Sequence, residues 1–176
     1  MKYKVEFYSN WHCGSGQTAG ADIDALVIKD IDGLPFIPGK TIKGLMREAV
    51  ANILHFQEKD ESLLDDLFGS ENRQGTLYFP NATLSEPLIQ AIKNAEDIDR
   101  TMFFQSFSST AISEEGVAKD HSLRRIETVI PCTLYGDIIG VEPDCQEVIS
   151  MALRLIKRLG VGRNRGLGRC ELSKID

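Results

Sequence analysis

The sequence lacks the features that define a metal knuckle, a disulfide framework or a membrane span. No apolar run approaches the roughly 20 residues that a membrane span needs, and charged residues appear within the first seven positions, too early for the core of a signal peptide. There is no Cys-x-x-Cys pair, and the cysteines are scattered, at Cys13, Cys132, Cys145 and Cys170. We therefore expect a cytoplasmic protein with reduced thiols and no membrane partner.

The composition is also unlike that of a collagen-like, low-complexity or disordered chain. Of the 176 residues, 42% are hydrophobic and 26% are charged, as in ordinary globular proteins. A chain of this length buries roughly 70% of its unfolded surface, so it needs no disulfide or metal to fold. It is too short for a (β/α)₈ barrel of about 250 residues. We expect a single domain over residues 1–176.

Positive charge is scarce overall but concentrated near the C-terminus. The net charge is −6, which by itself disfavours a nucleic-acid partner. Residues 1–147, however, carry 13 basic and 24 acidic side chains, whereas residues 148–176 carry seven basic and two acidic ones. A polyanion responds to such a local patch more than to the net charge. Nucleic-acid binding through the C-terminal part therefore stays open.

Hydrophobic periodicity predicts an alternation of strands and helices. The clearest element is a helix over Thr41–Gln57, whose apolar residues recur at helical spacing, with Thr41 as a candidate cap. Further helices are expected at Leu63–Phe68, Glu86–Ala95 and Pro143–Leu159. Asn10–Ala21 and Ser108–His121 are expected to be polar loops. Strands are expected at Lys2–Ser9, Ala25–Ile28, Gly75–Phe79, Asn81–Leu84, Met102–Phe107, Leu123–Ile130, Thr133–Val141 and Leu167–Ile175.

Without the insertions, this order is β-α-β-β-α-β. The sequence therefore predicts an α+β fold of the ferredoxin-like (RRM-like) type with one protruding insertion. Phe103, Phe104 and Phe107 could stack on bases, but their spacing along a strand favours a place in the core. Many functions use this fold, so the fold alone does not decide among them.

A glycine- and arginine-rich segment gives the strongest functional signal. Leu159–Arg169 follows a predicted helix and precedes a predicted strand. Glycine lets a backbone approach a phosphate closely, and arginine binds phosphate oxygens through its paired N–H groups. A dinucleotide-binding G-x-G-x-x-G motif has the opposite order, strand before helix, so a nicotinamide or flavin cofactor is excluded. A flexible basic surface turn is the alternative.

A second segment, Gly33–Arg47, contains Gly-Lys-Thr but departs from a nucleotide-binding P-loop. Five residues, not four, separate Gly33 from Gly39, and two prolines remove N–H donors. ATP or GTP binding is thus a weak alternative. The basic start of a helix, where free N–H groups and the helix dipole favour an anion, is the better interpretation.

Together these segments resemble the RAMP superfamily of CRISPR-associated proteins, most closely the repeated backbone subunit of type III effector complexes. Pro38–Arg47 reproduces that family's Pro-Gly-(Ser/Thr)-x-x-Lys-Gly-x-x-Arg pattern, with Lys40 where serine is more usual. The segment Gly20–Asp30 and the C-terminal glycine loop match as well. The resemblance implies a ferredoxin-like palm, a thumb insertion at about residues 108–130 and a glycine-rich loop at 159–169.

The resemblance also implies partners and a reaction. The expected partners are guide (CRISPR) RNA, target RNA, copies of the same subunit and other type III effector subunits. An aspartate before the first helix is expected to cleave target RNA with the help of a divalent metal ion, for which Mg²⁺ is the expected identity. Asp24 aligns best as this acid and possible metal ligand, Asp22 is a competitor, and His12 matches a family position near the active site.

The expected RNA-binding residues lie in the helix start, the thumb and the glycine loop. Three alternatives to target cleavage by Asp24 stay open: Asp22 and Asp24 are inert surface acids, the protein is a non-catalytic RNA-binding subunit, or it is a guide-processing endoribonuclease that uses His12. The expected RNA contacts are Lys40, Thr41, Lys43, Gly44, Arg47, Lys119, His121, Arg124, Arg125, Gly160, Gly162, Arg163, Arg165, Gly166, Gly168 and Arg169.

Overall fold

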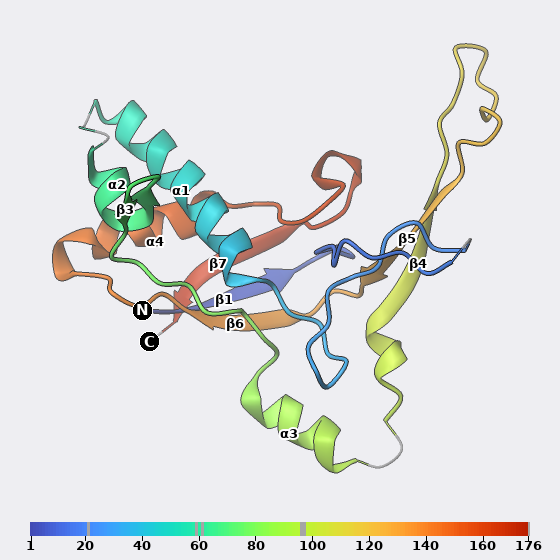
Figure 1. The fold of residues 1–176 in the computed structure, drawn as a ribbon, viewed down its shortest axis with the longest axis horizontal. Helices are drawn as coiled ribbons and strands as arrows, with labels where there is room; N and C mark the ends of the chain where they lie inside the picture. Colours follow the sequence, from blue (N-terminus) through green and yellow to red (C-terminus); the bar gives the residue numbers. More distant parts are fainter. Residues whose placement is uncertain (21, 59, 61, 96–97, 176) are drawn as a thin grey trace.

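The computed structural model describes residues 1–20, 22–58, 60, 62–95 and 98–175, so Ala21 of the predicted loop Asn10–Ala21 lies outside the described residues. The chain is α+β, as predicted (Figure 1). In chain order its helices and strands are β1 (Lys2–Phe7), α1 (Gly39–Phe56), α2 (Ser62–Phe68), β2 (Gly69–Ser70), β3 (Arg73–Gln74), α3 (Glu86–Asn94), β4 (Phe104–Ser109), β5 (Arg124–Val129), β6 (Thr133–Asp137), α4 (Gln146–Leu155) and β7 (Cys170–Ile175).

The central sheet has the strand order β6-β1-β7, with antiparallel pairing on both sides of β1. Val5 of β1 lies between Leu134 on β6 and Leu172 on β7. Along β1 the buried residues alternate with exposed or half-buried ones, so Tyr3, Val5 and Phe7 face the core. Helix α4 packs on β7 and α1 packs on α4, which leaves the opposite face of the sheet open.

The strand pair predicted between residues 75 and 84 is present only as an irregular edge of the sheet. Residues 78–83 run antiparallel to the end of β6, and Tyr78 exchanges backbone hydrogen bonds with Ile139 at 2.9 and 3.0 Å. Pro80 interrupts this segment, and a proline has no N–H to donate to a ladder. The edge therefore pairs at isolated positions.

Helix α1 begins two residues earlier than predicted. Its N-cap is Pro38, with no side-chain hydrogen bond, so the prediction that Thr41 caps the helix is wrong. The Thr41 N–H instead donates to the Pro38 carbonyl at 2.9 Å. The predicted apolar stripe does face the core, with buried side chains at Ile42, Met46, Ala49, Val50, Ile53 and Leu54.

Helix α4 is shorter than the predicted span Pro143–Leu159. A 3₁₀ turn at Pro143–Cys145 precedes it, and the helix ends at Leu155. The residues after it turn back along the start of β7, where the Leu159 N–H donates to the Gly168 carbonyl at 2.9 Å. This long-range bond competes with the helical periodicity of the segment, and the sequence pattern does not reveal it.

The insertion expected at residues 108–130 is a long antiparallel hairpin. Strands β4 and β5 pair from Phe104–Val129 to Ser109–Arg124, and the hairpin projects away from the central sheet (Figure 1). It therefore begins four residues earlier than predicted, directly after a 3₁₀ turn at Arg100–Phe103. Phe103 and Phe104 pack against the core, which supports the interpretation that they are structural.

Two smaller features complete the fold. Helix α2 ends at Phe68 as predicted, but the short hairpin of β2 and β3 that follows was not predicted. Residues 25–28, expected as a strand edge, make only isolated bridges, one of them between Ala25 and Ile126 of β5. In the part of the chain that the structure describes, no helix has both the length and the apolar character needed to cross a membrane.

We expect Gly39→Ala to destabilise the fold by about 1–3 kcal/mol, as overpacking of a close contact does. A Cβ at Gly39 would overlap the carbonyl oxygen of Phe79 in the irregular edge. Urea unfolding would measure the change. Gly44→Ala is the matched control, because nothing lies within 4 Å of its added Cβ and alanine in a helix is about 0.5–1 kcal/mol better than glycine. Equal stabilities of the two variants would contradict this view of α1.

Candidate nucleic-acid interface

The glycine-rich segment forms a closed loop that stands off the sheet (Figure 1). A bridge between Arg158 and Arg169 closes its base. Gly160 and Gly168 both have positive φ, and a Cβ at either one would overlap a backbone carbonyl oxygen, that of His12 or Leu159. These two glycines are thus required by the packing of the loop. Gly162 and Gly166 also have positive φ.

The arginines of this loop are directed outwards. Arg163, Arg165 and Arg169 are exposed, and the Arg158 guanidinium donates a hydrogen bond to the Arg163 carbonyl, which holds the 3₁₀ turn Arg163–Arg165. Among the described residues, neither Arg163 nor Arg165 forms an ion pair with an acid. Their positive charge is therefore available to an anion.

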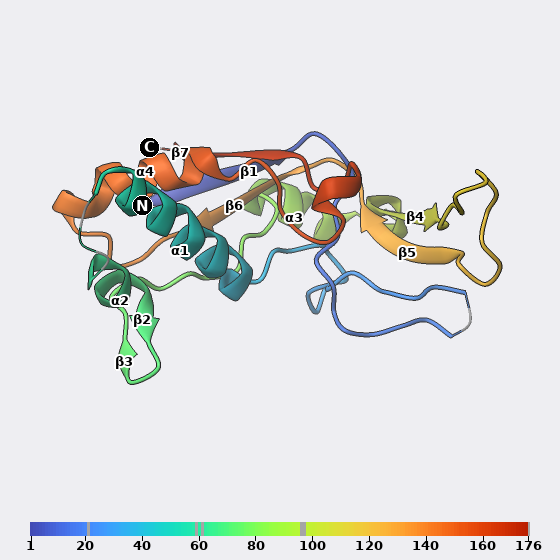
Figure 2. The ribbon, with the colours of Figure 1, turned by 90° about the horizontal axis from the view of Figure 1, so that it is seen from above.

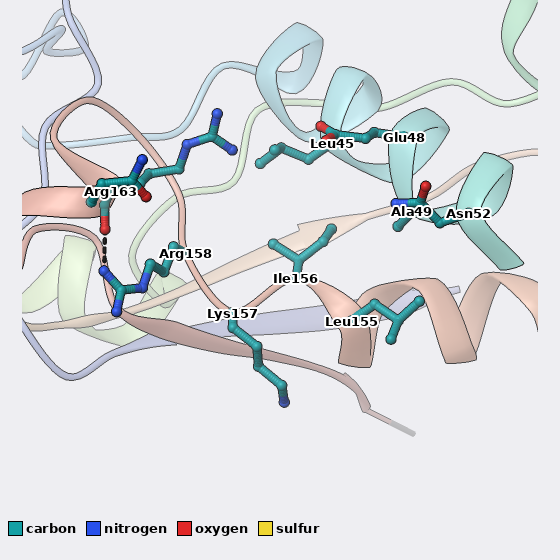
Figure 3. A pocket seen from close by; sticks show the side chains of 10 residues that line it. Leu45, Glu48, Ala49, Asn52, Leu155, Ile156, Lys157, Arg158 and Arg163 are labelled. Atoms are coloured by element: carbon teal, nitrogen blue, oxygen red, sulfur yellow. Dashed lines mark hydrogen bonds between the residues drawn. The ribbon is translucent and has the colours of Figure 1, made fainter.

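A groove of about 350 Å³ lies between this loop and helix α1. Leu45, Glu48, Ala49 and Asn52 of α1 form one wall, and Leu155–Arg158 with Arg163 and Asn164 form the other (Figure 3). The loop thus faces the middle of α1, and none of the residues predicted to bind RNA at the helix start lines the groove itself. Lys157, Arg158 and Asn164 were not predicted as site residues. Lys157 and Arg158 precede the glycine- and arginine-rich segment, and Asn164, within it, is neither glycine nor arginine.

Only some of the residues predicted to bind RNA at the start of α1 are exposed to solvent. Lys40 and Gly44 are exposed, whereas Thr41 and Lys43 are half-buried. The Gly39 N–H already donates to Asn81 Oδ1 at 2.9 Å. A P-loop uses the corresponding N–H groups for phosphate, so this hydrogen bond removes support from the ATP or GTP hypothesis.

Arg47, predicted to bind RNA, has partners within the protein. Its guanidinium donates to the Gly69 carbonyl and forms an ion pair with Asp65 at 3.1 Å. These contacts join α1 to α2 and to the hairpin that follows. The structure therefore gives Arg47 a structural role, and the last position of the helix motif is explained without RNA.

Asp24 lies on an extended segment that pairs with the first residues of β5, at the end of the β4–β5 ladder nearer the hairpin tip. The Asp24 N–H donates to the Arg125 carbonyl at 2.7 Å, and the Arg125 N–H donates to Asp24 Oδ2 at 2.7 Å. The side chain is exposed, so the carboxylate is held by one oxygen and presented to solvent by the other. Asp22 is also exposed, two residues nearer the loop tip.

His12, the third catalytic candidate, is buried, with 2% of its surface exposed. Its Nδ1 lies 2.6 Å from the Glu127 carbonyl oxygen, to which the protonated ring nitrogen donates. Its own carbonyl accepts from the Val161 N–H at 2.9 Å. His12 thus connects the glycine loop to β5, and its burial gives no support to a guide-processing nuclease that uses this ring.

The thiols of Cys13, which follows His12, and of Cys170, at the start of β7, are unsuited to catalysis. Burial raises the pKa of Cys13 to about 12 and that of Cys170 to about 12. Both thiols therefore stay protonated at neutral pH, and the thiolate is the form that attacks or binds metal.

The basic residues of the hairpin lie on its exposed part. Arg124 and Arg125 are on β5, and Lys119 and His121 are in the connection at the tip. His121 has a positive φ of 56°. Figures 1 and 2 show this hairpin, the loop that carries Asp24 and the glycine loop at the same end of the sheet, away from the N-terminus.

The open face of the sheet is less suited to RNA. Glu6 on β1 lies directly opposite Glu171 on β7, and Tyr8 donates to Glu171 at 3.2 Å. Lys4 pairs with Glu6 at 3.2 Å, but the Glu171 carboxylate beside it has no basic partner among the ion pairs of the described residues, and an unpaired carboxylate repels a phosphate backbone. The basic end of the molecule, and not the sheet surface, is the candidate interface.

Comparison with known proteins gives the family. The family model of the RAMP superfamily matches residues 4–171. The chain belongs to the RAMP superfamily. It is 27% identical over 200 residues to the CRISPR system Cms endoribonuclease Csm3 of Streptococcus thermophilus, in an alignment that covers 98% of this chain and 86% of that protein.

Solved structures share the RAMP fold of this chain. A chain of the type III-B Cmr-beta complex bound to cognate target RNA has a TM-score of 0.71 at 13% identity, with 98% of this chain and 95% of that chain covered. The apo state of Cmr-beta gives a TM-score of 0.72 at 14% identity, with 97% and 95% covered. The predicted family is thus confirmed.

The donor set for a metal in this RAMP protein is small. Within the described ranges, no group of three or more His, Cys, Asp or Glu side chains could hold an ion. Mg²⁺, however, is commonly bound through one or two carboxylates together with substrate phosphates. Asp24 fits that pattern, since one of its oxygens faces solvent beside the basic hairpin.

The paired replacement Arg163→Ala and Arg165→Ala is expected to weaken binding of guide-length single-stranded RNA. Loss of two phosphate contacts should lower the slope of log affinity against log salt by about 1.4, at about 0.7 per contact. A filter-binding titration over salt measures both quantities. Lys2→Ala with Lys174→Ala is the matched control, because it removes two exposed positive charges from β1 and β7 that form no ion pair among the described residues. Equal losses in the two double variants would refute a specific role of the loop.

Gly44→Ala is expected to stabilise the protein and yet to weaken RNA binding several-fold. Gly44 is exposed on the helix beside the groove, with no atom within 4 Å of an added Cβ. Folding therefore gives no reason for glycine here, whereas close approach of a ribose-phosphate backbone does. Thermal unfolding and RNA titration on the same sample test this. Unchanged RNA affinity would mean that the position is merely a helical glycine.

Proposed function

We propose that this RAMP protein is a guide-RNA-binding backbone subunit of a type III CRISPR effector complex, and that it cleaves complementary target RNA at regular intervals. The observation that carries the proposal is the exposed Asp24 carboxylate, which accepts a hydrogen bond from Arg125 of the basic hairpin. The relative Csm3 is named an endoribonuclease, and one structural relative is a Cmr-beta complex bound to target RNA.

The chain in this proposal is one RAMP domain over residues 1–176, with a ferredoxin-like palm and a thumb. The strand order β7-β1-β6 followed by the edge segment 78–83 is that of a βαββαβ sheet, with α1 and α4 as its two helices. The hairpin of β4 and β5 is the thumb. Its tip residues are polar or exposed, so they are suited to contacts outside the palm.

Guide RNA would lie along the start of α1 and the glycine loop. The exposed Lys40, Arg163, Arg165 and Arg169 supply positive charge, and the positive end of the α1 dipole adds to it. The thumb residues Lys119, His121, Arg124 and Arg125 would contact the same guide or its paired target. Most of the binding energy should come from phosphate contacts, which make affinity strongly dependent on salt.

Target cleavage would proceed by attack of the 2′-oxygen on the adjacent phosphorus. The P–O5′ bond would break, which leaves a 2′,3′-cyclic phosphate and a 5′-oxygen that takes up a proton from solvent. The free oxygen of Asp24 can accept the hydroxyl proton, while the bond from Arg125 to its other oxygen fixes the carboxylate. Displacement of a base by the thumb would hold the backbone near the in-line attack geometry, which alone accelerates the reaction. A divalent ion, Mg²⁺ in this proposal, would be held by Asp24 and RNA phosphates and would stabilise the developing negative charge.

Copies of the chain and other effector subunits would assemble along the guide. The acidic remainder, 24 acidic against 13 basic side chains in residues 1–147, is then available for protein partners. The four cysteines are free, which suits a complex that works in the reducing cytoplasm.

Asp24→Asn is expected to abolish target cleavage in the assembled complex without loss of guide binding. Asparagine keeps an oxygen that accepts from the Arg125 N–H, but it can neither take up a proton nor supply a charged metal ligand. Cleavage of a matched, labelled target with Mg²⁺ measures the effect. Asp22→Asn is the control and should retain cleavage. A dead Asp22 variant beside an active Asp24 variant would assign the reaction to Asp22, and two active variants would favour a non-catalytic subunit.

A further inference from the structure

We propose that Glu127 is a positioning residue for the cleavage reaction, one that sets the place of Asp24 without touching RNA. The inference rests on the proposed function of Asp24. It concerns a residue on β5 that no sequence motif identifies, and it follows from the hydrogen bonds that Glu127 makes with the segment on which Asp24 lies.

Every polar group of Glu127 binds a residue outside the hairpin. Its N–H donates to the Ala25 carbonyl at 2.9 Å, and its carbonyl accepts from the His12 ring. Its carboxylate accepts from the Val27 N–H through Oε2 at 3.0 Å and from Lys29 Nζ through Oε1 at 2.8 Å. One residue of β5 thus holds three residues of the segment that begins at Asp24.

These bonds define the register of that segment. Asp24 and Arg125 exchange two hydrogen bonds, and the backbone of Glu127 binds the residue that follows Asp24. The Glu127 side chain then extends the pairing to Val27, beyond the reach of the strand backbone. A slip of one residue would place an apolar neighbour of Asp24, Ile23 or Ala25, beside Arg125 and turn the carboxylate away.

The carboxylate also needs its charge. The Glu127 side chain is only 13% exposed, and a carboxylate removed from water must be paired or hydrogen-bonded. Lys29 supplies the pairing charge, and its ammonium group lies 4.0 Å from the centre of the Phe104 ring on β4. Glu127 therefore holds the Asp24 segment on β5 directly, and its partner Lys29 connects the same segment to β4.

The decisive comparison is between Glu127→Ala and Glu127→Gln in the assembled complex. Alanine removes both carboxylate bonds, and displacement of Asp24 by about 1 Å should slow single-turnover target cleavage about 100-fold. Glutamine keeps an oxygen for the Val27 N–H and should recover most of that loss. Target affinity should stay within about twofold for both variants, because Glu127 does not contact RNA. Glu171→Ala, which removes an exposed acid from β7, is the matched control and should cleave normally.

A second measurement does not depend on activity or metal. Amide hydrogen exchange at Val27 and Asp24 should be faster in Glu127→Ala than in the unaltered protein, while it should be unchanged in Asp24→Asn. If Glu127→Ala does not fold, Lys29→Met together with Glu127→Gln tests the same contacts with smaller changes, and slower cleavage at unchanged affinity is expected of the pair.

The two proposals fail in different ways. Normal cleavage by Glu127→Ala beside a dead Asp24→Asn would overturn the role of Glu127 alone. Equal losses of target affinity and cleavage in Glu127→Ala would also overturn it, because a general structural defect acts on both. Active Asp24→Asn would instead overturn the proposed function.

Discussion

The candidate interface depends on the backbone hydrogen bonds of one short segment, residues 10–13, which follows β1. Trp11 exchanges two hydrogen bonds with Val129 of β5, at 3.0 and 2.8 Å. The Asn10 carbonyl accepts from Gly168, the His12 carbonyl from Val161 and the Cys13 carbonyl from Ile28. The glycine loop, the hairpin and the Asp24 segment are therefore bound to one another through this segment. Trp11, fully buried and stacked on Phe7 with ring centres 4.6 Å apart, anchors it.

This arrangement explains how a protein of net charge −6 can present a basic surface. The arginines of the glycine loop face solvent, whereas paired carboxylates such as Glu6 and Glu171 lie on the open face of the sheet. Because screening limits charge interactions to about 10 Å at 0.1 M salt, a phosphate strand at the basic end responds to the local charge. The acids elsewhere have little effect on it.

Periodic elements were predictable because each is determined by its own side chains. The apolar stripe of α1 and the alternation in β1 both appear in the structure as buried faces. The polar stretch within residues 108–121 correctly indicated a segment without a core. The same prediction for Asn10–Ala21 was wrong at its start, where Trp11, His12 and Cys13 are buried. The end of α4 and the partners of Arg47 were not predictable, because each depends on a residue distant in the sequence.

The sequence by itself determined the α+β class, the RAMP resemblance and the chemistry of the candidate residues, since motifs and hydrophobic spacing are local properties of the chain. Only the tertiary structure decided which candidates reach solvent together. It buried His12, bound Arg47 to Gly69 and Asp65, left Asp24 exposed beside Arg125 of the hairpin and joined Glu127 to the Asp24 segment. The physical reason is that hydrogen-bond partners and burial are set by contacts between distant segments, and local sequence does not record them.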